Sequence, residues 1–140
     1  MESNENIGYK EIEHTADKAL HVCGRNLEEL LLNAARGLNS LMLADEATIS
    51  DRTQKYVAVE AFDAESLLVE WLSELAYWAE TEMLVFTRFD LQKVTPTKVE
   101  ANLFGDKVEK LEKHIKAVTY HNLRIAKTDQ GLEATIVFDV

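Results

Sequence analysis

The residues of this 140-residue chain that are most suited to chemistry are two aspartates near its ends. Asp17 follows an apparent strand end, and Asp139 lies on the polar phase of a last segment that alternates as far as Val140. A strand that continues to the last residue would bring the α-carboxylate of Val140 into ordered structure beside Asp139. Hard oxygens of this kind suit Ca²⁺ or Mg²⁺, so the residues suggest a divalent-cation site.

The same two aspartates also fit a role without metal. Asp is common in turns because its side chain bonds to nearby backbone groups, and terminal residues often fray. Spacing alone favours this second interpretation, and it cannot place Asp17 and Asp139 side by side.

A softer ligand set, suited to zinc, could be drawn from His21 and Cys23 with His14 and His121. Zinc sites ordinarily contain closely spaced pairs such as Cys-x-x-Cys, and this sequence has none. Cys23 is therefore predicted to be a small buried residue. The sequence also lacks the Gly-rich motifs of nucleotide sites and the Gly-x-Ser-x-Gly motif of hydrolases.

The charge balance is acidic, with 15 Lys and Arg against 25 Asp and Glu and a net charge of −10. Proteins that bind RNA or DNA unaided usually carry a basic stripe, and none is visible here. Acidity of this size serves solubility, cation binding or docking to a basic protein surface.

The chain is predicted to be cytoplasmic, with no membrane segment. No apolar run approaches the ~18 residues that a membrane span needs. The polar, acidic start lacks the basic and apolar regions of a signal peptide. One cysteine cannot form an internal disulfide, which fits a reducing compartment.

Two amphipathic helices should position these residues. An apolar stripe predicts a helix over 27–42, capped by Asn26 with Glu29 at its third position. Asp63 should cap a second helix, whose apolar face includes Trp71 and Trp78 as core residues.

Most of the remaining chain is strand-like, and the pattern predicts an α+β fold. Residues 106–114 are predicted to be helical, and 128–131 should form the turn of a terminal hairpin. We expect residues 1–140 to form a single two-layer domain, with the two main helices packed on a largely antiparallel sheet. The expected strands lie at 8–14, 19–23, 55–62, 84–89, 98–104, 115–126 and 132–140.

Four segments, in order along nearly the whole chain, resemble the archease family. They are Glu-His-Thr-Ala-Asp at 13–17, Trp-Leu-Ser-Glu-Leu at 71–75 with Glu-Thr-Glu at 80–82, Lys-Ala-Val-Thr-Tyr-His at 116–121 and Val-Phe-Asp-Val at 137–140. The resemblance implies a non-enzymatic cofactor of an RtcB-type RNA ligase, which joins tRNA exons. It implies promotion of ligase guanylylation and of multiple turnover, with RNA contacted only through the ligase.

The resemblance also implies a divalent cation, calcium in the family, bound by Asp17, Asp139 and Val140. His14 belongs to the motif and is interpreted as a supporting group, because calcium sites rarely use imidazole. Lys18 departs from the family pattern and would weaken cation binding unless its side chain points away.

Two other functions remain open at this point. Asp17 and Asp139 could serve a small metal-dependent hydrolase, because two carboxylates and a metal can activate water. No general base or Arg cluster accompanies either residue. A chaperone-like interaction module would need only the acidic surface and no metal.

Overall fold

The computed structural model describes residues 8–13, 17–45 and 48–140. Its helices are α2 (Leu27–Met42) and α3 (Ala64–Glu82). Its strands are β1 (Tyr9–Glu13), β2 (Lys18–Gly24), β3 (Thr53–Glu60), β4 (Leu84–Thr95), β5 (Lys98–Lys107), β6 (Ala117–Thr119), β7 (Ala126–Thr128) and β8 (Gly131–Asp139).

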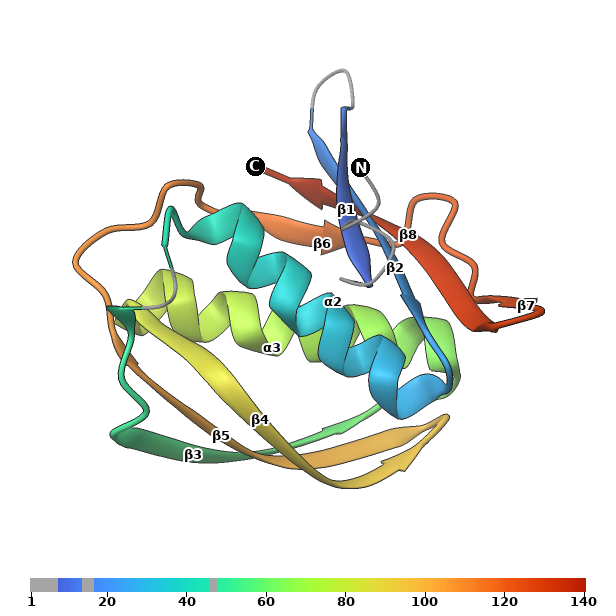
Figure 1. Cartoon of the computed structure of the whole chain (residues 1–140), viewed down its shortest axis with the longest axis horizontal. Coiled ribbons are helices and arrows are strands. Elements are labelled where there is room, and N and C mark those ends of the chain that lie inside the picture. The colour runs from blue at the N-terminus through green and yellow to red at the C-terminus, as the bar shows by residue number, and fades with distance from the viewer. Residues whose placement is uncertain (1–7, 14–16, 46–47) are drawn as a thin grey trace.

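The strands form two antiparallel sheets with the helices between them (Figure 1). One sheet has the order β1-β2-β8-β6, with β7 also paired to β8, and the other has the order β3-β5-β4. The predicted α+β class, with two helices packed on antiparallel strands, is confirmed. The strands divide between two sheets instead of forming one, so that both helices contact strands on both sides.

Each helix begins at the predicted capping residue. Asn26 Oδ1 accepts a hydrogen bond from the Glu29 N–H at 2.9 Å, and Asp63 Oδ1 accepts one from the Ser66 N–H at 2.8 Å. The bond from Ser66 lowers the pKa of the Asp63 carboxyl. These bonds satisfy amide groups that have no partner within the first helical turn.

The core lies between the helices and the two sheets, and it contains the predicted tryptophan. Trp71 is fully buried, and its indole N–H donates to the Leu31 carbonyl at 2.9 Å. Trp78 is half-buried and donates to Glu74 Oε2 at 3.1 Å. The prediction that both rings serve packing is confirmed, because each packs against the core and satisfies its one polar group within the protein.

Residues 106–114 do not form the predicted helix. Lys107 ends β5, and the following backbone instead caps the two helices. The Val108 N–H donates to the Met83 carbonyl at 2.8 Å, and the Glu112 N–H donates to the Met42 carbonyl at 2.7 Å. Carbonyls at helix C-termini lack intrahelical partners, so these contacts use the amide groups that a local helix would need.

The predicted strand at 115–126 is also shorter in the structure, where β6 covers three of its residues and β7 begins at its last residue, Ala126. The predicted terminal hairpin is confirmed, with Thr128 opposite Gly131. Neither described helix has the length and apolar character that crossing a membrane requires.

Candidate functional site

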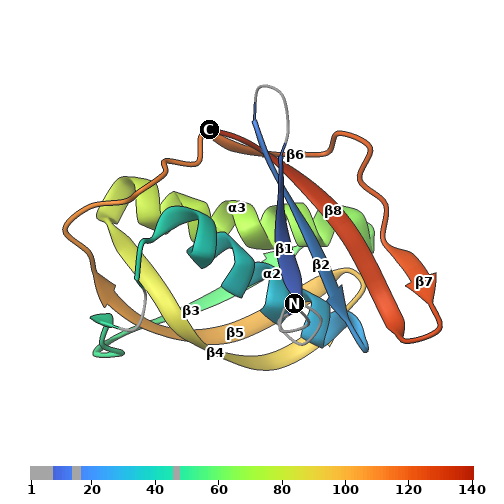
Figure 2. The same cartoon turned by 45° about the horizontal axis from the view of Figure 1, so that its top comes forward.

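Pairing of β2 with β8 brings together the two ends that carry the candidate aspartates. Lys18 lies opposite Phe138 in the last pair of this antiparallel register, and Asp17 and Asp139 are the residues adjoining that pair on the two chains. Figure 2 shows the C-terminal end beside the start of β2. Two positions separated by most of the chain therefore adjoin one pair of the strand register.

The end of β8 is held on both of its sides. β2 pairs along one edge, and Ala117 of β6 lies opposite Asp139 on the other. The Lys116 N–H donates to the Asp139 carbonyl at 2.7 Å, and Val140 packs against the core. This arrangement differs from a frayed terminus, and it gives the Asp139 side chain a fixed backbone.

The two carboxylates differ in burial. Asp17 is half-buried, with its Oδ1 atom out of contact with solvent, whereas Asp139 is exposed. Together with the main-chain oxygens of Val140 they present hard donors, of the kind that calcium and magnesium select. The pair is thus reachable from outside on the Asp139 side.

The chain's similarity to known proteins spans the parts that build this site. The model of the archease protein family matches residues 9–140, which include Asp17, Asp139 and Val140. The chain belongs to the archease family. Archease from Methanosarcina barkeri is 35% identical over 146 residues, with 99% of each chain covered. Archease from Archaeoglobus fulgidus is 34% identical, covering 94% of this chain and 98% of the relative.

Solved archease-like structures share the fold. The solution structure of Methanobacterium thermoautotrophicum protein 1598 has a TM-score of 0.81 at 26% identity, covering 96% of this chain and 99% of its own. The crystal structure of a Thermotoga maritima archease, described as a possible chaperone, has a TM-score of 0.67 at 26% identity. It covers 94% of this chain and 96% of its own.

Lys18, the departure from the archease pattern, is directed to another carboxylate. Its Nζ atom lies 2.9 Å from Glu11 Oε2, on the neighbouring strand β1. Its partner in the register, Phe138, is fully buried, whereas Asp139 on the alternate phase is exposed. Because successive strand residues face opposite sides, Lys18 and Asp17 diverge, and the ammonium is neutralised by Glu11.

The side-chain ligands within the described ranges do not by themselves complete a metal site. No group of three or more His, Cys, Asp and Glu side chains in residues 8–13, 17–45 and 48–140 is arranged to hold a metal ion. A cation at Asp17 and Asp139 would therefore need main-chain oxygens or water as well. His14, the predicted supporting residue, lies outside the described residues.

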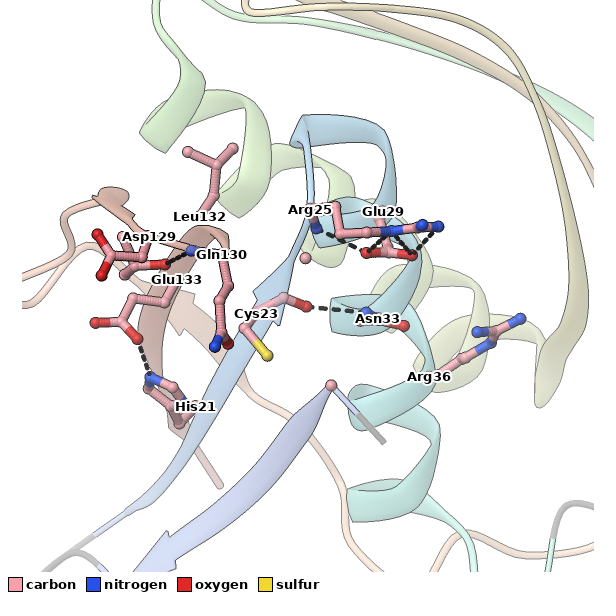
Figure 3. A pocket seen from close by; sticks show the side chains of 13 residues that line it. His21, Cys23, Arg25, Glu29, Asn33, Arg36, Asp129, Gln130, Leu132 and Glu133 are labelled. Carbon is pink, nitrogen blue, oxygen red and sulfur yellow. Dashed lines mark hydrogen bonds and ion pairs between the residues drawn. The ribbon is translucent and has the colours of Figure 1, made fainter. Parts of the chain in front are cut away.

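The alternative zinc ligands are only partly gathered. Figure 3 shows His21 and Cys23 on β2, lining a pocket of about 750 Å³ together with Arg25, Glu29 and Asn33. His21 Nε2 lies 3.5 Å from Glu133 Oε1. His121 does not join them in any metal-binding group of the described chain, and its Nε2 instead lies 3.3 Å from Asn122.

Cys23 is half-buried, so the prediction that it is a buried residue is wrong. The alternation of β2 sends Leu20 and Val22 into the core, which leaves Cys23 on the face that lines the pocket. Asn33, itself buried, donates to the Cys23 carbonyl at 2.9 Å. These contacts fix the pocket wall through the backbone of Cys23 and leave its thiol facing the pocket.

The opposite wall of this pocket is an ion pair at the start of α2. Glu29 Oε1 accepts a hydrogen bond from the Arg25 N–H at 2.7 Å, and its Oε2 accepts one from Arg25 Nη2 at 3.1 Å. These bonds lower the pKa of Glu29, the backbone bond most, and raise the pKa of Arg25. The pocket is mixed in charge, with no excess of cations that would select an anion.

Sequence reasoning did not identify a second cavity, of about 380 Å³, between α3 and β6. The acidic composition of α3, with five Glu and no Lys or Arg, is visible in the sequence, but only Glu80 of these lines the cavity. The other wall of the cavity is β6, and a strand of three residues is too short for its pairing to be predicted from sequence.

Proposed function

We propose that this chain is a non-enzymatic activator of an RtcB-type RNA ligase in tRNA exon joining. It promotes ligase guanylylation and multiple turnover, and it uses a divalent cation, calcium or magnesium, held by Asp17, Asp139 and Val140. The activator role is supported by membership of the archease family over residues 9–140. The observation that supports the site is the β2–β8 register, whose last pair, Lys18 with Phe138, adjoins both Asp17 and Asp139.

The residues around the site suit a hard cation that a partner protein can reach. The buried oxygen of Asp17 and the core contacts of Val140 anchor one side, and the exposed Asp139 opens to the surface. A cation bound there would offer positive charge and open coordination positions to groups of the ligase. The Lys116 N–H and the β6 pairing hold Asp139 in place for this contact.

Charge complementarity supports a protein partner over direct RNA contact. A net charge of −10 repels the phosphate backbone, whereas an RNA ligase needs a basic surface to bind its substrate. An acidic activator can dock near that surface, and the approach is steered over a distance of about one Debye length, ~8 Å at physiological salt.

The test measures formation of the ligase–guanylate adduct from GTP, and RNA joining over several turnovers, with and without this chain. Asp17→Ala should remove the stimulation while the circular-dichroism spectrum stays unchanged. Asp129→Ala is the matched control, because Asp129 is an exposed carboxylate in the β7–β8 turn and its loss changes the net charge equally. Equal stimulation by wild type and Asp17→Ala would refute the site.

Chelation separates the proposal from the other two functions. Stimulation that persists in excess EDTA would indicate a metal-independent chaperone-like module; the Thermotoga maritima relative is described as a possible chaperone. Cleavage of a phosphodiester substrate by this chain alone would indicate a metal-dependent hydrolase. The proposed activator should show no cleavage and should lose stimulation when the cation is removed.

A further inference from the structure

A groove between α3 and β6 lies outside the proposed cation site. Its floor is apolar and buried, formed by Ala76, Ile115 and Val118, and the exposed ring of Tyr77 stands at its rim. With a volume of about 380 Å³ it can accept side chains of another chain.

Two carboxylates of α3 bind the backbone and a side chain on either side of β6, and one of them, Glu80, lines the groove. Glu80 Oε2 accepts a hydrogen bond from the Ile115 N–H at 3.1 Å, just before β6, and its Oε1 lies 3.1 Å from Nδ1 of the exposed His114. Glu70 Oε2 accepts one from the Tyr120 hydroxyl at 3.3 Å, just after β6. The strand is therefore held at a fixed spacing from the helix, and the groove is part of the folded structure.

β6 is an edge strand of its sheet. Ala117, Val118 and Thr119 pair with β8 on one side, and the sheet order ends there within the described part of the chain. An edge strand presents main-chain donors and acceptors to an added strand, and binding by strand addition is a recurring mode of peptide recognition.

The surroundings of the groove favour a cationic occupant. The sequence of α3 has five Glu and no Lys or Arg, so the helix that forms one wall of the groove carries only negative side-chain charge. Tyr77 is 59% exposed and Tyr120 is 54% exposed. Exposed aromatic faces beside carboxylates attract Lys and Arg side chains. Lys116 is a cation that also lines the groove. Because it is exposed, its flexible side chain can extend into solvent and leave room for a cationic occupant.

We propose that this groove binds an extended, basic segment of a partner protein. The segment pairs with the free edge of β6 and lays alternate Lys or Arg side chains over α3, against Tyr77 and the Glu70 and Glu80 carboxylates. The inference stands apart from the proposed ligase function, because it is tested by peptide binding without ligase, RNA or metal.

The test uses a fluorescein-labelled decapeptide of alternating Arg and Thr, with fluorescence anisotropy as the readout. Saturable binding is expected, and a peptide with Glu in place of Arg should not bind. Methylation of alternate backbone amides of the peptide should abolish binding, because it removes the donors for strand pairing. Tyr77→Ala should weaken binding roughly fivefold, since one cation–π contact is lost.

Tyr56→Ala is the matched control, because Tyr56 on β3 has the same 59% exposure as Tyr77 and lies on the other sheet. It should leave binding unchanged. Equal loss in both variants, equal binding of the Glu peptide, or no saturation would overturn the proposal. A further result would also overturn it: the peptide fails to bind, sedimentation shows a concentration-dependent dimer, and Tyr77→Ala abolishes that dimer. The groove would then bind a second copy of this chain. Ser73→Arg, which places a cation inside the groove, should block the basic peptide and provides an independent check.

Discussion

Replacing Asp17 by Asn should reverse the order of stability between variant and wild type when calcium is added. In the proposed site Asp17 and Asp139 extend the register one position beyond the Lys18–Phe138 pair, and without metal like charges facing each other across strands are destabilising. Two charges ~5 Å apart in water repel by about 0.8 kcal/mol. The neutral amide should therefore raise the metal-free melting temperature of the variant slightly.

With calcium the balance changes sign. At a hundredfold excess over the dissociation constant, the cation stabilises the wild type by ~2.7 kcal/mol. The entropy of unfolding is about 2.1 cal/mol/K per residue, or about 0.29 kcal/mol/K for 140 residues, so the melting temperature should rise by about 9 °C. If the variant binds about a hundredfold more weakly, the same calcium stabilises it by only about 0.4 kcal/mol, which is about 1 °C.

Scanning calorimetry in EDTA and in calcium measures all four values. Asp129→Asn removes the same charge from an exposed turn and should keep the wild-type rise. A rise in Asp17→Asn within 2 °C of the wild-type rise would refute a direct role for Asp17. Loss of the rise in Asp129→Asn as well would show that calcium acts through net charge and not at this site.

Three further predictions concern the scaffold. Asn39→Ala should lower the free energy of unfolding by about 2 kcal/mol in urea titration, because the buried Asn39 amide donates to the Phe86 carbonyl at 2.7 Å. The control is the exposed neighbour: Ser40→Ala should change the free energy of unfolding by less than about 0.5 kcal/mol. Gly105→Ala should destabilise by at least about 1–3 kcal/mol, since a Cβ at this position collides with the Val85 carbonyl oxygen of β4; a urea midpoint equal to wild type would contradict this. Hydrogen bonds to Asp106, of which the bond from Ser50 has the largest effect, lower the pKa of this carboxyl from 3.8 to about 2. The ionised carboxylate therefore stabilises the fold above pH 4, and this stabilisation is lost as the pH falls toward 2. Stability measured during acid titration of Asp106→Asn should not show this loss.

The helices could be predicted from sequence because their signals are local. Asn26 and Asp63 cap the first turns through residues three positions ahead, and these bonds do not depend on the rest of the fold. The apolar residues that begin at Leu27 likewise recur with the period of a helix, which can be read from this segment alone. The structure therefore places both helix starts at the predicted residues.

The segment from 106 to 126 was mispredicted because its backbone partners are distant in sequence. Met42 and Met83 accept the Glu112 and Val108 amides, and α3 carboxylates accept further amides, as Glu65 does from Ile125 at 3.0 Å. The hydrophobic pattern of a segment does not show which distant residues bond to its backbone. The same limit applies to the division of strands into two sheets, which depends on pairing and not on the period of each strand.

For the candidate site, too, the sequence indicates which residue types could bind a cation but not where those residues lie relative to one another. The choice of Asp17 and Asp139 came from residue type and family resemblance, but a strand pattern fixes only which face a residue occupies. Slipping the β2–β8 register by one residue would send every side chain of β8 to the other face, and Phe138 would leave the core. Burial of Phe138 therefore fixes the register, and the pair that Phe138 forms with Lys18 adjoins both Asp17 and Asp139. The apolar core and the acidic site are products of one alignment, so substitutions that loosen Phe138 should disturb the site even though Phe138 carries no ligand atom.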